Sequence, residues 1–149
     1  MIRNFFLADD DRDDTDLFGE ALKKIDKEIV FHSAANGKEL IEKLHTTNAK
    51  PEIIFLDINM PEVDGWESLK RLKQHETLRE IPVVMYSTSS AYIDGHRAIK
   101  SGAVCYLEKP ASFVKLKEFL QEVTHSSKDR LKETLTSIEA SKKHKIVVS

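Results

Sequence analysis

Short apolar runs alternate along the chain with segments in which apolar residues recur every three or four positions. The apolar runs predict strands at residues 5–8, 29–31, 53–56, 83–86 and 104–107. The helical spacing predicts helices at residues 14–24, 38–45, 66–75, 93–100 and 112–124, with Asp14 as the expected N-cap of the first. This order predicts an α/β fold with a five-stranded, doubly wound parallel sheet and helices on both faces.

Two of the predicted strands differ in their apolar character. Residues 53–56 read Ile-Ile-Phe-Leu without interruption, which is typical of a central parallel strand that helices cover on both sides. The run at residues 29–31 is shorter and has polar neighbours, which favours an edge position.

Polar side chains follow the predicted strands at the points where these strands end. Asp9 and Asp10 follow the first strand, Asp57 the third, Ser87 the fourth and Lys109 the fifth. The carboxyl ends of parallel strands meet at one edge of a sheet, where such folds bind ligands. Three carboxylates brought together repel one another unless a cation neutralises them, and an all-oxygen ligand set favours a hard ion such as Mg²⁺. We therefore expect a Mg²⁺ site with room for a phosphoryl group, and a carboxylate there can itself accept that group.

Charge and composition exclude several other classes of protein. The 149 residues carry a formal charge of only -2, so the basic footprint of a nucleic-acid-binding protein is absent. A lone cysteine, Cys105, allows no internal disulfide. No apolar run is long enough to span a membrane, and no export signal opens the chain. These features lead us to expect a cytoplasmic protein without nucleic-acid or membrane partners.

The C-terminal segment differs from the rest of the chain. We expect one domain over residues 1–125 and a tail over residues 126–149, which carries six basic and three acidic residues. Leu131, Leu135 and Ile138 are spaced as on a short amphipathic helix. The sequence leaves open whether this tail is a helix that contacts a partner, a contact in a homodimer, or a disordered extension.

Four separated motifs give the chain a specific resemblance. They are Phe-Phe-Leu-Ala-Asp-Asp at residues 5–10, the stretch from Ile54 to Gly65, Pro-Val-Val-Met-Tyr-Ser at residues 82–87, and Tyr-Leu-Glu-Lys-Pro at residues 106–110. In this order they resemble the receiver domain of response regulators, in its single-domain, chemotaxis-type (CheY-like) class. The resemblance covers roughly residues 2–125, and it implies a flavodoxin-like sheet with strand order 2-1-3-4-5. The polar loop at residues 87–90 and the acid-rich start are also similar to single-domain receivers paired with phytochrome-type kinases.

The resemblance implies a role for each residue at the strand ends. Asp57 matches the phosphoacceptor. Asp10, Asp57 and the backbone carbonyl of Asn59 would bind Mg²⁺ directly, and Asp9 would act mainly through water. Ser87 and Lys109 match the groups that bind the phosphoryl oxygens. Tyr106 matches an aromatic switch that turns inward as Ser87 moves, and Pro110 would follow a cis peptide bond.

The resemblance also implies a signalling function in a two-component system. The chain would accept a phosphoryl group from a phosphohistidine on a sensor histidine kinase or histidine phosphotransfer protein, and it would later lose this group to water. It would not be a conventional turnover enzyme. A downstream protein would bind the face formed by residues 93–100, 104–107 and 112–124, because phosphorylation shifts a two-state equilibrium that includes this face.

Two alternative functions come from other classes of protein. The chain could be a receiver-shaped interaction module that needs no phosphate, although an intact acidic pocket argues against this. Residues 11–15 also resemble the motif of haloacid-dehalogenase-type phosphohydrolases, with Asp11 as the nucleophile and Asp13 as the acid or base. That reading requires Asp11 at the tip of the first strand, where Asp9 stands, and further acids after the fourth strand, where the chain has Ser87 to Ser90.

Overall fold

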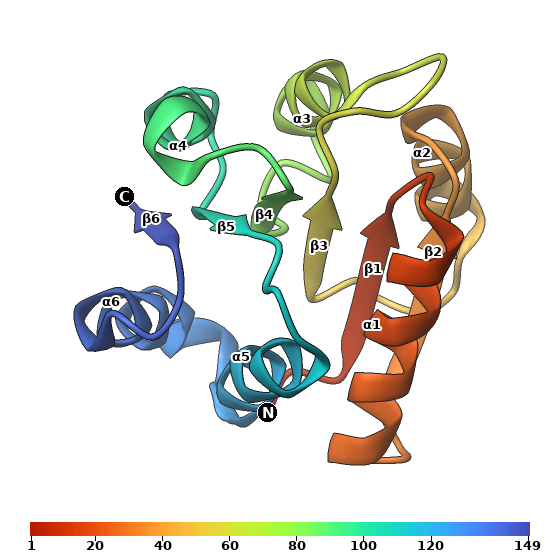
Figure 1. Ribbon diagram of the computed structural model, residues 1–149. Coiled ribbons are helices and arrows are strands. Elements are labelled where there is room, and N and C mark those ends of the chain that lie inside the picture. Colours follow the sequence, from red (N-terminus) through yellow and green to blue (C-terminus); the bar gives the residue numbers. More distant parts are fainter.

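A single six-stranded sheet lies between two layers of helices in the computed structural model, which describes residues 1–149 (Figure 1). The strand order is β2-β1-β3-β4-β5-β6. The strands are β1 (Asn4–Ala8), β2 (Val30–Ala34), β3 (Ile53–Leu56), β4 (Val83–Ser87), β5 (Cys105–Glu108) and β6 (Ile146–Val148). The helices are α1 (Arg12–Ile25), α2 (Gly37–Thr46), α3 (Gly65–Gln74), α4 (Ala91–Lys100), α5 (Phe113–His125) and α6 (Leu131–Ser141), with a 3₁₀ turn at Lys128–Arg130 before α6.

The first five strands are parallel, and their order confirms the predicted fold class. Strand β1 pairs with β2 on one side and β3 on the other, while β4 and β5 continue the sheet beyond β3. Every residue of β3 is buried and β2 lies at the sheet edge, as their apolar patterns predict. The carboxyl ends of β1, β3 and β4 therefore lie next to one another.

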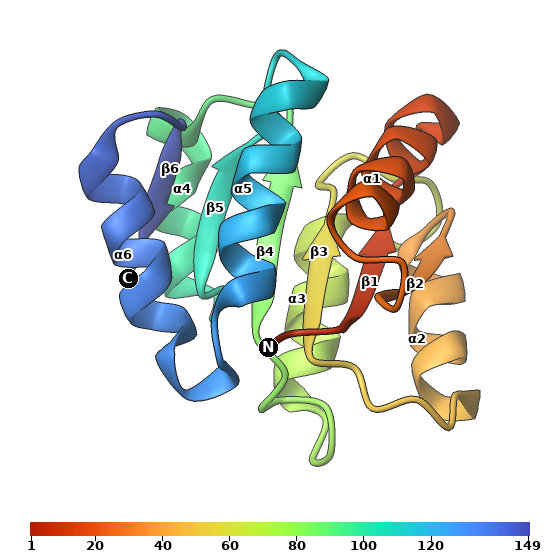
Figure 2. The same cartoon turned by 90° about the horizontal axis from the view of Figure 1, so that it is seen from below.

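Each face of the sheet packs against its own set of helices, and each face has its own core. Helices α1, α5 and α6 cover one face, and α2, α3 and α4 cover the other (Figures 1 and 2). Phe55 of β3 faces the first core, where its ring packs edge-on against Phe18 of α1 and Phe119 of α5. Its neighbours Ile54 and Leu56 face the second core. None of the helices has the length and apolar character that crossing a membrane requires.

Side chains at the loop ends set where the helices begin. Asp11 caps α1, because its carboxylate accepts the N–H of Asp14 at 3.1 Å. The expectation that Asp14 caps this helix is therefore wrong, since the helix begins two residues earlier, at Arg12. Asp64 caps α3 in the same way by accepting the N–H of Glu67 at 2.9 Å.

The C-terminal segment is part of the same folded body, which differs from the expected tail. Helix α6 forms where the apolar spacing predicts it, with Leu131, Leu135 and Ile138 buried in the core shared with α1 and α5. The chain then returns as β6, which pairs antiparallel with β5 and makes the sheet six-stranded rather than five-stranded. The alternative of a disordered extension is wrong for this structure, because burying Leu131, Leu135 and Ile138 and pairing the free edge of β5 both favour docking. The domain boundary at residue 125 stays a prediction, and α5 ends at that residue. Part of the expected partner-binding face, the outer edge of β5, is thus covered by the chain itself.

Candidate functional site

Three carboxylates meet at the carboxyl edge of the sheet. Asp9 lies one residue beyond β1 and Asp57 one residue beyond β3, and both are buried, whereas the adjacent Asp10 is exposed. One ligand oxygen from each of the three residues lies within 4.8 Å of the others. Parallel pairing positions them, because the N–H of Asp57 donates to the carbonyl of Ala8 at 2.9 Å and so aligns the ends of β1 and β3. This cluster is the one that the strand ends predict.

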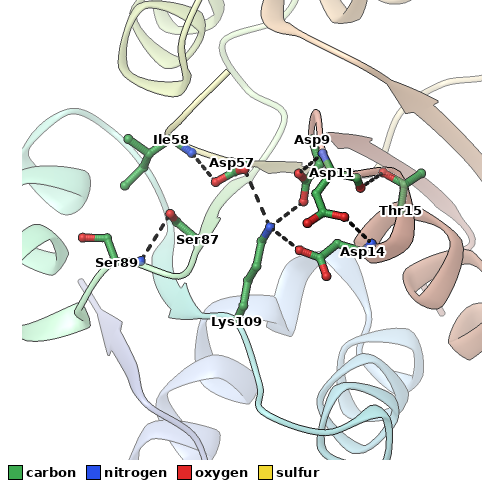
Figure 3. Close-up of polar contacts among 9 residues, drawn as sticks. All are labelled: Asp9, Asp11, Asp14, Thr15, Asp57, Ile58, Ser87, Ser89 and Lys109. Atoms are coloured by element: carbon green, nitrogen blue, oxygen red, sulfur yellow. Dashed lines mark hydrogen bonds and ion pairs between the residues drawn. The ribbon is translucent and has the colours of Figure 1, made fainter. Parts of the chain in front are cut away.

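Lys109 brings a positive charge to these carboxylates from the end of β5 (Figure 3). Its Nζ lies 2.8 Å from Asp9 Oδ2 and 3.7 Å from Asp57 Oδ2, and it donates a hydrogen bond of 2.7 Å to Asp14 Oδ2. One cation therefore contacts the carboxylates of Asp9, Asp14 and Asp57, and the carboxylate of Asp10 lies near those of Asp9 and Asp57. The site keeps a net negative charge, which favours a further cation.

Burial and pairing shift the protonation of two of these groups. Burial raises the pKa of Asp9 from 3.8 to about 6, against the lowering effect of Lys109 and of the Asp11 N–H. Burial by itself would lower the pKa of Lys109, but its bonds to Asp14 and Asp9 and the nearby charge of Asp57 raise it above its ordinary value. Lys109 therefore stays charged at neutral pH.

Backbone N–H groups orient the two buried carboxylates. Asp57 Oδ1 accepts the N–H of Ile58 at 2.8 Å, and Asp9 Oδ1 accepts the N–H of Asp11 at 2.9 Å. The loop after Asp57 then folds back tightly, and the N–H of Gly65 donates to the carbonyl of Ile58 at 2.8 Å. A Cβ at residue 65 would lie 2.2 Å from the carbonyl oxygen of Asp57, so only glycine fits there.

The donor set fits a hard divalent cation. Asp9 Oδ2 is buried and lies 2.8 Å from Lys109 Nζ, a cation that it shares with Asp14 and Asp57. Buried carboxylate oxygens are normally hydrogen-bonded or coordinate a metal. Three carboxylates with no histidine or cysteine are the ligands that Mg²⁺ prefers. Asn59 is exposed and lies two residues after Asp57.

Ser87 and Tyr106 lie on the side of the site toward α4. Ser87 is fully buried as the last residue of β4, and its Oγ accepts the N–H of Ser89 at 3.4 Å. Tyr106 is fully buried in β5, and its hydroxyl donates to the carbonyl of Ser89 at 2.7 Å. Both residues thus contact the β4–α4 loop, with the Tyr106 ring in an inward position.

The peptide bond before Pro110 is trans, so the expected cis bond is wrong for this structure. The trans form is intrinsically favoured, by about 0.5–1 kcal/mol for bonds to proline. The N–H of Lys109 donates to the carbonyl of Ser87 at 2.7 Å, which fixes the start of the β5–α5 loop next to β4.

Asp14 is the site residue that sequence reasoning missed. The sequence predicts it only as an N-cap of the first helix, yet it makes the shortest contact of Lys109. Nothing in the sequence separates Asp14 from the other acids of this run. Asp11, in contrast, caps α1, and exposed Asp13 lies outside the cluster, so neither occupies the place that a phosphohydrolase nucleophile requires.

Comparison with curated proteins gives related signalling proteins. The chain is 38% identical over 92 residues to a probable methanogenesis regulatory protein, FilR2, of Methanothrix harundinacea. This alignment covers 59% of this chain and 59% of FilR2. It is 34% identical over 90 residues to the chemotaxis protein CheY1 of Helicobacter pylori, covering 60% of this chain and 72% of CheY1. It also matches several protein-glutamate methylesterases, of whose length it spans only 22% to 35%.

Solved structures and a family model agree with this result. The phosphorylated cyanobacterial phytochrome response regulator RcpA superposes with a TM-score of 0.75 at 29% identity, covering 85% of this chain and 96% of RcpA. The Mn²⁺-bound form of the response regulator Rcp1 gives a TM-score of 0.73 at 26% identity, covering 84% of this chain and 96% of Rcp1. The model of the response regulator receiver domain matches residues 5–121. The chain therefore belongs to the receiver domain family of response regulators.

Proposed function

We propose that this chain accepts a phosphoryl group on Asp57 from a phosphohistidine of a sensor histidine kinase or a histidine phosphotransfer protein. The observation that carries the proposal is the meeting of Asp9, Asp10 and Asp57 within 4.8 Å, with Lys109 Nζ beside them. A cluster of carboxylates with a single cation beside it does not stabilise the fold well, because like charges repel. It is well suited to bind a metal ion together with a phosphoryl group.

The carboxylates of Asp9, Asp10 and Asp57 and the backbone carbonyl of Asn59 would hold Mg²⁺, with Asp9 acting mainly through water. The Mn²⁺-bound form of Rcp1 supports a divalent cation in this family. When bound, Mg²⁺ neutralises the carboxylates and the oxygens of the transferring phosphoryl group.

In the transfer itself, Asp57 supplies the oriented nucleophile. A carboxylate oxygen of Asp57 attacks the phosphorus atom, the bond between phosphorus and the histidine nitrogen breaks, and that nitrogen keeps the bonding electron pair. Asp57 is held for this attack by the N–H of Ile58. A separate hydrolysis step ends the signal: water attacks phosphorus, the bond between phosphorus and the Asp57 oxygen breaks, and inorganic phosphate and the free carboxylate are released. Each chain is itself the phosphoryl acceptor, and its phosphorylated form is the signal, so we do not expect a conventional turnover enzyme.

Lys109 and Ser87 would bind the phosphoryl oxygens. Lys109 Nζ is 3.7 Å from Asp57, so a small movement away from Asp14 brings it to a phosphoryl oxygen on Asp57. Ser87 is buried at the adjacent strand end, and its hydroxyl can donate to another of these oxygens. Movement of Ser87 would change the β4–α4 loop, which the Tyr106 hydroxyl contacts.

A downstream protein would bind the part of the α4–β5–α5 face that stays exposed. Strand β6 covers the edge of β5, but the first turn of α4 exposes Tyr92 at 91% and Ile93 at 72%. Both follow directly on the β4–α4 loop that carries Ser89. A change at the phosphorylation site therefore has a short path to these apolar side chains.

Intact-mass measurement after incubation with acetyl phosphate tests the proposal. We expect a single labile phosphoryl adduct on the parent chain in the presence of Mg²⁺, and none without Mg²⁺ or in the Asp57→Asn variant. An adduct that persists in Asp57→Asn would place the acceptor elsewhere. If the parent chain forms no adduct and binds no beryllofluoride, a phosphate-independent interaction module becomes the better description.

A further inference from the structure

The C-terminal strand β6 covers the side of the sheet next to the proposed switch residue. It pairs antiparallel with β5, so that Val147 lies directly opposite Tyr106, and α4 packs over both strands (Figure 1). Residues alternate along β6. Ile146 and Val148 pack into the core with α5 and α6, whereas Val147 packs into the opposite core, which contains Tyr106.

Helix α4 has a shape that accommodates this strand. Gly95 is buried in the middle of α4, and a Cβ at this position would lie 2.6 Å from Cγ2 and 2.9 Å from Cβ of Val147. Valine has a stiff side chain that cannot turn away freely. Glycine in a helix interior costs about 1 kcal/mol relative to alanine, so the close approach of Val147 accounts for a residue that local propensity disfavours.

The position of Val147 restricts the ring of Tyr106. The ring is turned toward the β4 side, where its hydroxyl donates to the carbonyl of Ser89. Because β5 lies between β4 and β6, the side of Tyr106 that faces away from β4 is the side of β6. Side chains directly opposite each other on antiparallel strands have Cβ atoms about 4.5–5.5 Å apart. The Val147 side chain therefore fills the space that an outward Tyr106 ring needs.

We propose that strand β6 holds the Tyr106 ring inward, with Val147 as the positioning residue. The docked strand and the inward ring stabilise each other, and release of β6 opens the space for the outward ring. The chain thus supplies from its own C-terminus a contact that favours one state of the switch.

A consequence for phosphorylation rests on the proposed function above. If phosphorylation of Asp57 and movement of Ser87 favour the inward ring, the docked strand favours phosphorylation by the same free energy, because coupling between two sites is reciprocal. Phosphorylated chains then hold β6 more tightly than unphosphorylated ones. A weakened β6 contact lowers the affinity for a phosphoryl analogue.

The ring position can be measured without any phosphorylation. Tyr86 is 3% exposed and Tyr92 is 91% exposed, so the three tyrosines include a buried and an exposed reference for Tyr106. We would label the tyrosine rings for NMR and add a soluble paramagnetic agent to the full-length Gly95→Ala and Val147→Asp variants, with His96→Ala at an exposed position of α4 as the control. We expect Tyr106 to be protected like Tyr86 in the parent and control, and to move toward the exposure of Tyr92 in the two variants. Faster amide exchange of β6 with a Tyr106 ring that stays protected would overturn the proposal.

Beryllofluoride binding with Mg²⁺ tests the coupling to phosphorylation. We expect Gly95→Ala to weaken this binding about five-fold or more, and to have no such effect in a Tyr106→Leu background, where no ring can switch. Equal weakening in both backgrounds would mean that β6 acts through general stability and would overturn the coupling. A parent chain that forms no phosphoryl adduct and binds no beryllofluoride refutes the proposed function instead, and the NMR measurement still decides whether β6 positions Tyr106.

Discussion

At the scale of single residues, Lys109 is shared between carboxylates from different parts of the chain. Its Nζ lies 2.7 Å from Asp14, 2.8 Å from Asp9 and 3.7 Å from Asp57. The Asp14 contact is the shortest and the most exposed of the three, because the Asp14 side chain is 32% exposed. Asp14 therefore competes with any anion that needs Lys109, and it adds negative charge at the mouth of the site.

The Asp14→Asn variant is expected to bind beryllofluoride more tightly in the presence of Mg²⁺. Partly exposed ion pairs contribute up to about 1 kcal/mol, so the gain should be about two- to five-fold. Titration of beryllofluoride, followed by a spectroscopic change, gives the dissociation constant. Asp13→Asn is the matched control. This substitution removes the same charge one residue away, at an exposed position that does not contact Lys109. Equal gains in both variants would point to net charge rather than to the Asp14 contact.

We also expect the carboxylates of Asp9, Asp10 and Asp57 to destabilise the fold by mutual repulsion when no metal is bound. Asp57→Asn removes one of the clustered charges, while its amide oxygen can still accept the N–H of Ile58. We expect the free energy of unfolding to rise by about 0.5–2 kcal/mol without Mg²⁺, and the difference to disappear or reverse in excess Mg²⁺, which stabilises the parent by binding.

Urea denaturation with and without Mg²⁺ measures both values. Asp16→Asn, at an exposed position outside the cluster, should change neither value appreciably. A loss of stability in Asp57→Asn without Mg²⁺ would contradict the view that the clustered charges repel.

At the scale of elements, the loop between β3 and α3 decides where the Asp57 backbone lies. The loop leaves the strand at Asp57 and returns at Gly65, whose N–H bonds to Ile58. The close approach of these two backbone segments places the start of α3 directly beside the carbonyl of Asp57. The site therefore depends on a contact between backbone atoms as well as on its side chains.

Gly65→Ala should both destabilise the chain and impair the site. The added Cβ would lie 2.2 Å from the carbonyl oxygen of Asp57. This oxygen belongs to the backbone, which cannot move aside as easily as the end of a flexible side chain. We expect a loss of about 1–3 kcal/mol in the free energy of unfolding, together with weaker beryllofluoride binding. Gly19→Ala in α1 is the control, because its Cβ would meet only the Phe31 ring at 3.1 Å. If Gly65→Ala binds beryllofluoride as the parent does, the loop contact is not needed for the site.

At the scale of the whole molecule, the C-terminal segment closes the sheet. Strand β6 pairs with the edge of β5 that would otherwise be exposed, and an exposed edge promotes aggregation. Helix α6 adds Leu131, Leu135 and Ile138 to the core that contains α1 and α5. The receiver core and the C-terminal segment should therefore unfold as one cooperative unit.

Leu135→Ala tests this cooperativity. Leu135 is fully buried, and truncation of a buried leucine costs about 2–5 kcal/mol. We expect a loss of this size in a single unfolding transition, with the same midpoint by far-ultraviolet circular dichroism and by fluorescence of Trp66. Ser137→Ala, on the exposed side of α6, should shift the midpoint little. An early separate transition confined to α6 and β6 would show that the segment folds independently.

The sequence alone determined the order of the first five strands and first five helices, and most of the site. Asp9, Asp10, Asp57, Ser87 and Lys109 could be predicted to converge, because each directly follows or ends an apolar run and because parallel strands end at a common edge. The amphipathic spacing of α6 was readable for the same reason, since periodicity is a local property of the chain.

Only the tertiary structure decided the contacts between distant segments. Asp14 lies 95 residues from Lys109, and nothing local distinguishes it from the neighbouring acids. Strand β6 has three residues, too few for a periodic pattern, and its place beside β5 follows from the free edge and from the fit of Val147 against Gly95. The inward ring of Tyr106 likewise depends on a contact with a distant segment, since its hydroxyl donates to the carbonyl of Ser89. Local pattern specifies which residues form each element, whereas the complementarity of surfaces far apart in sequence decides which side chains meet.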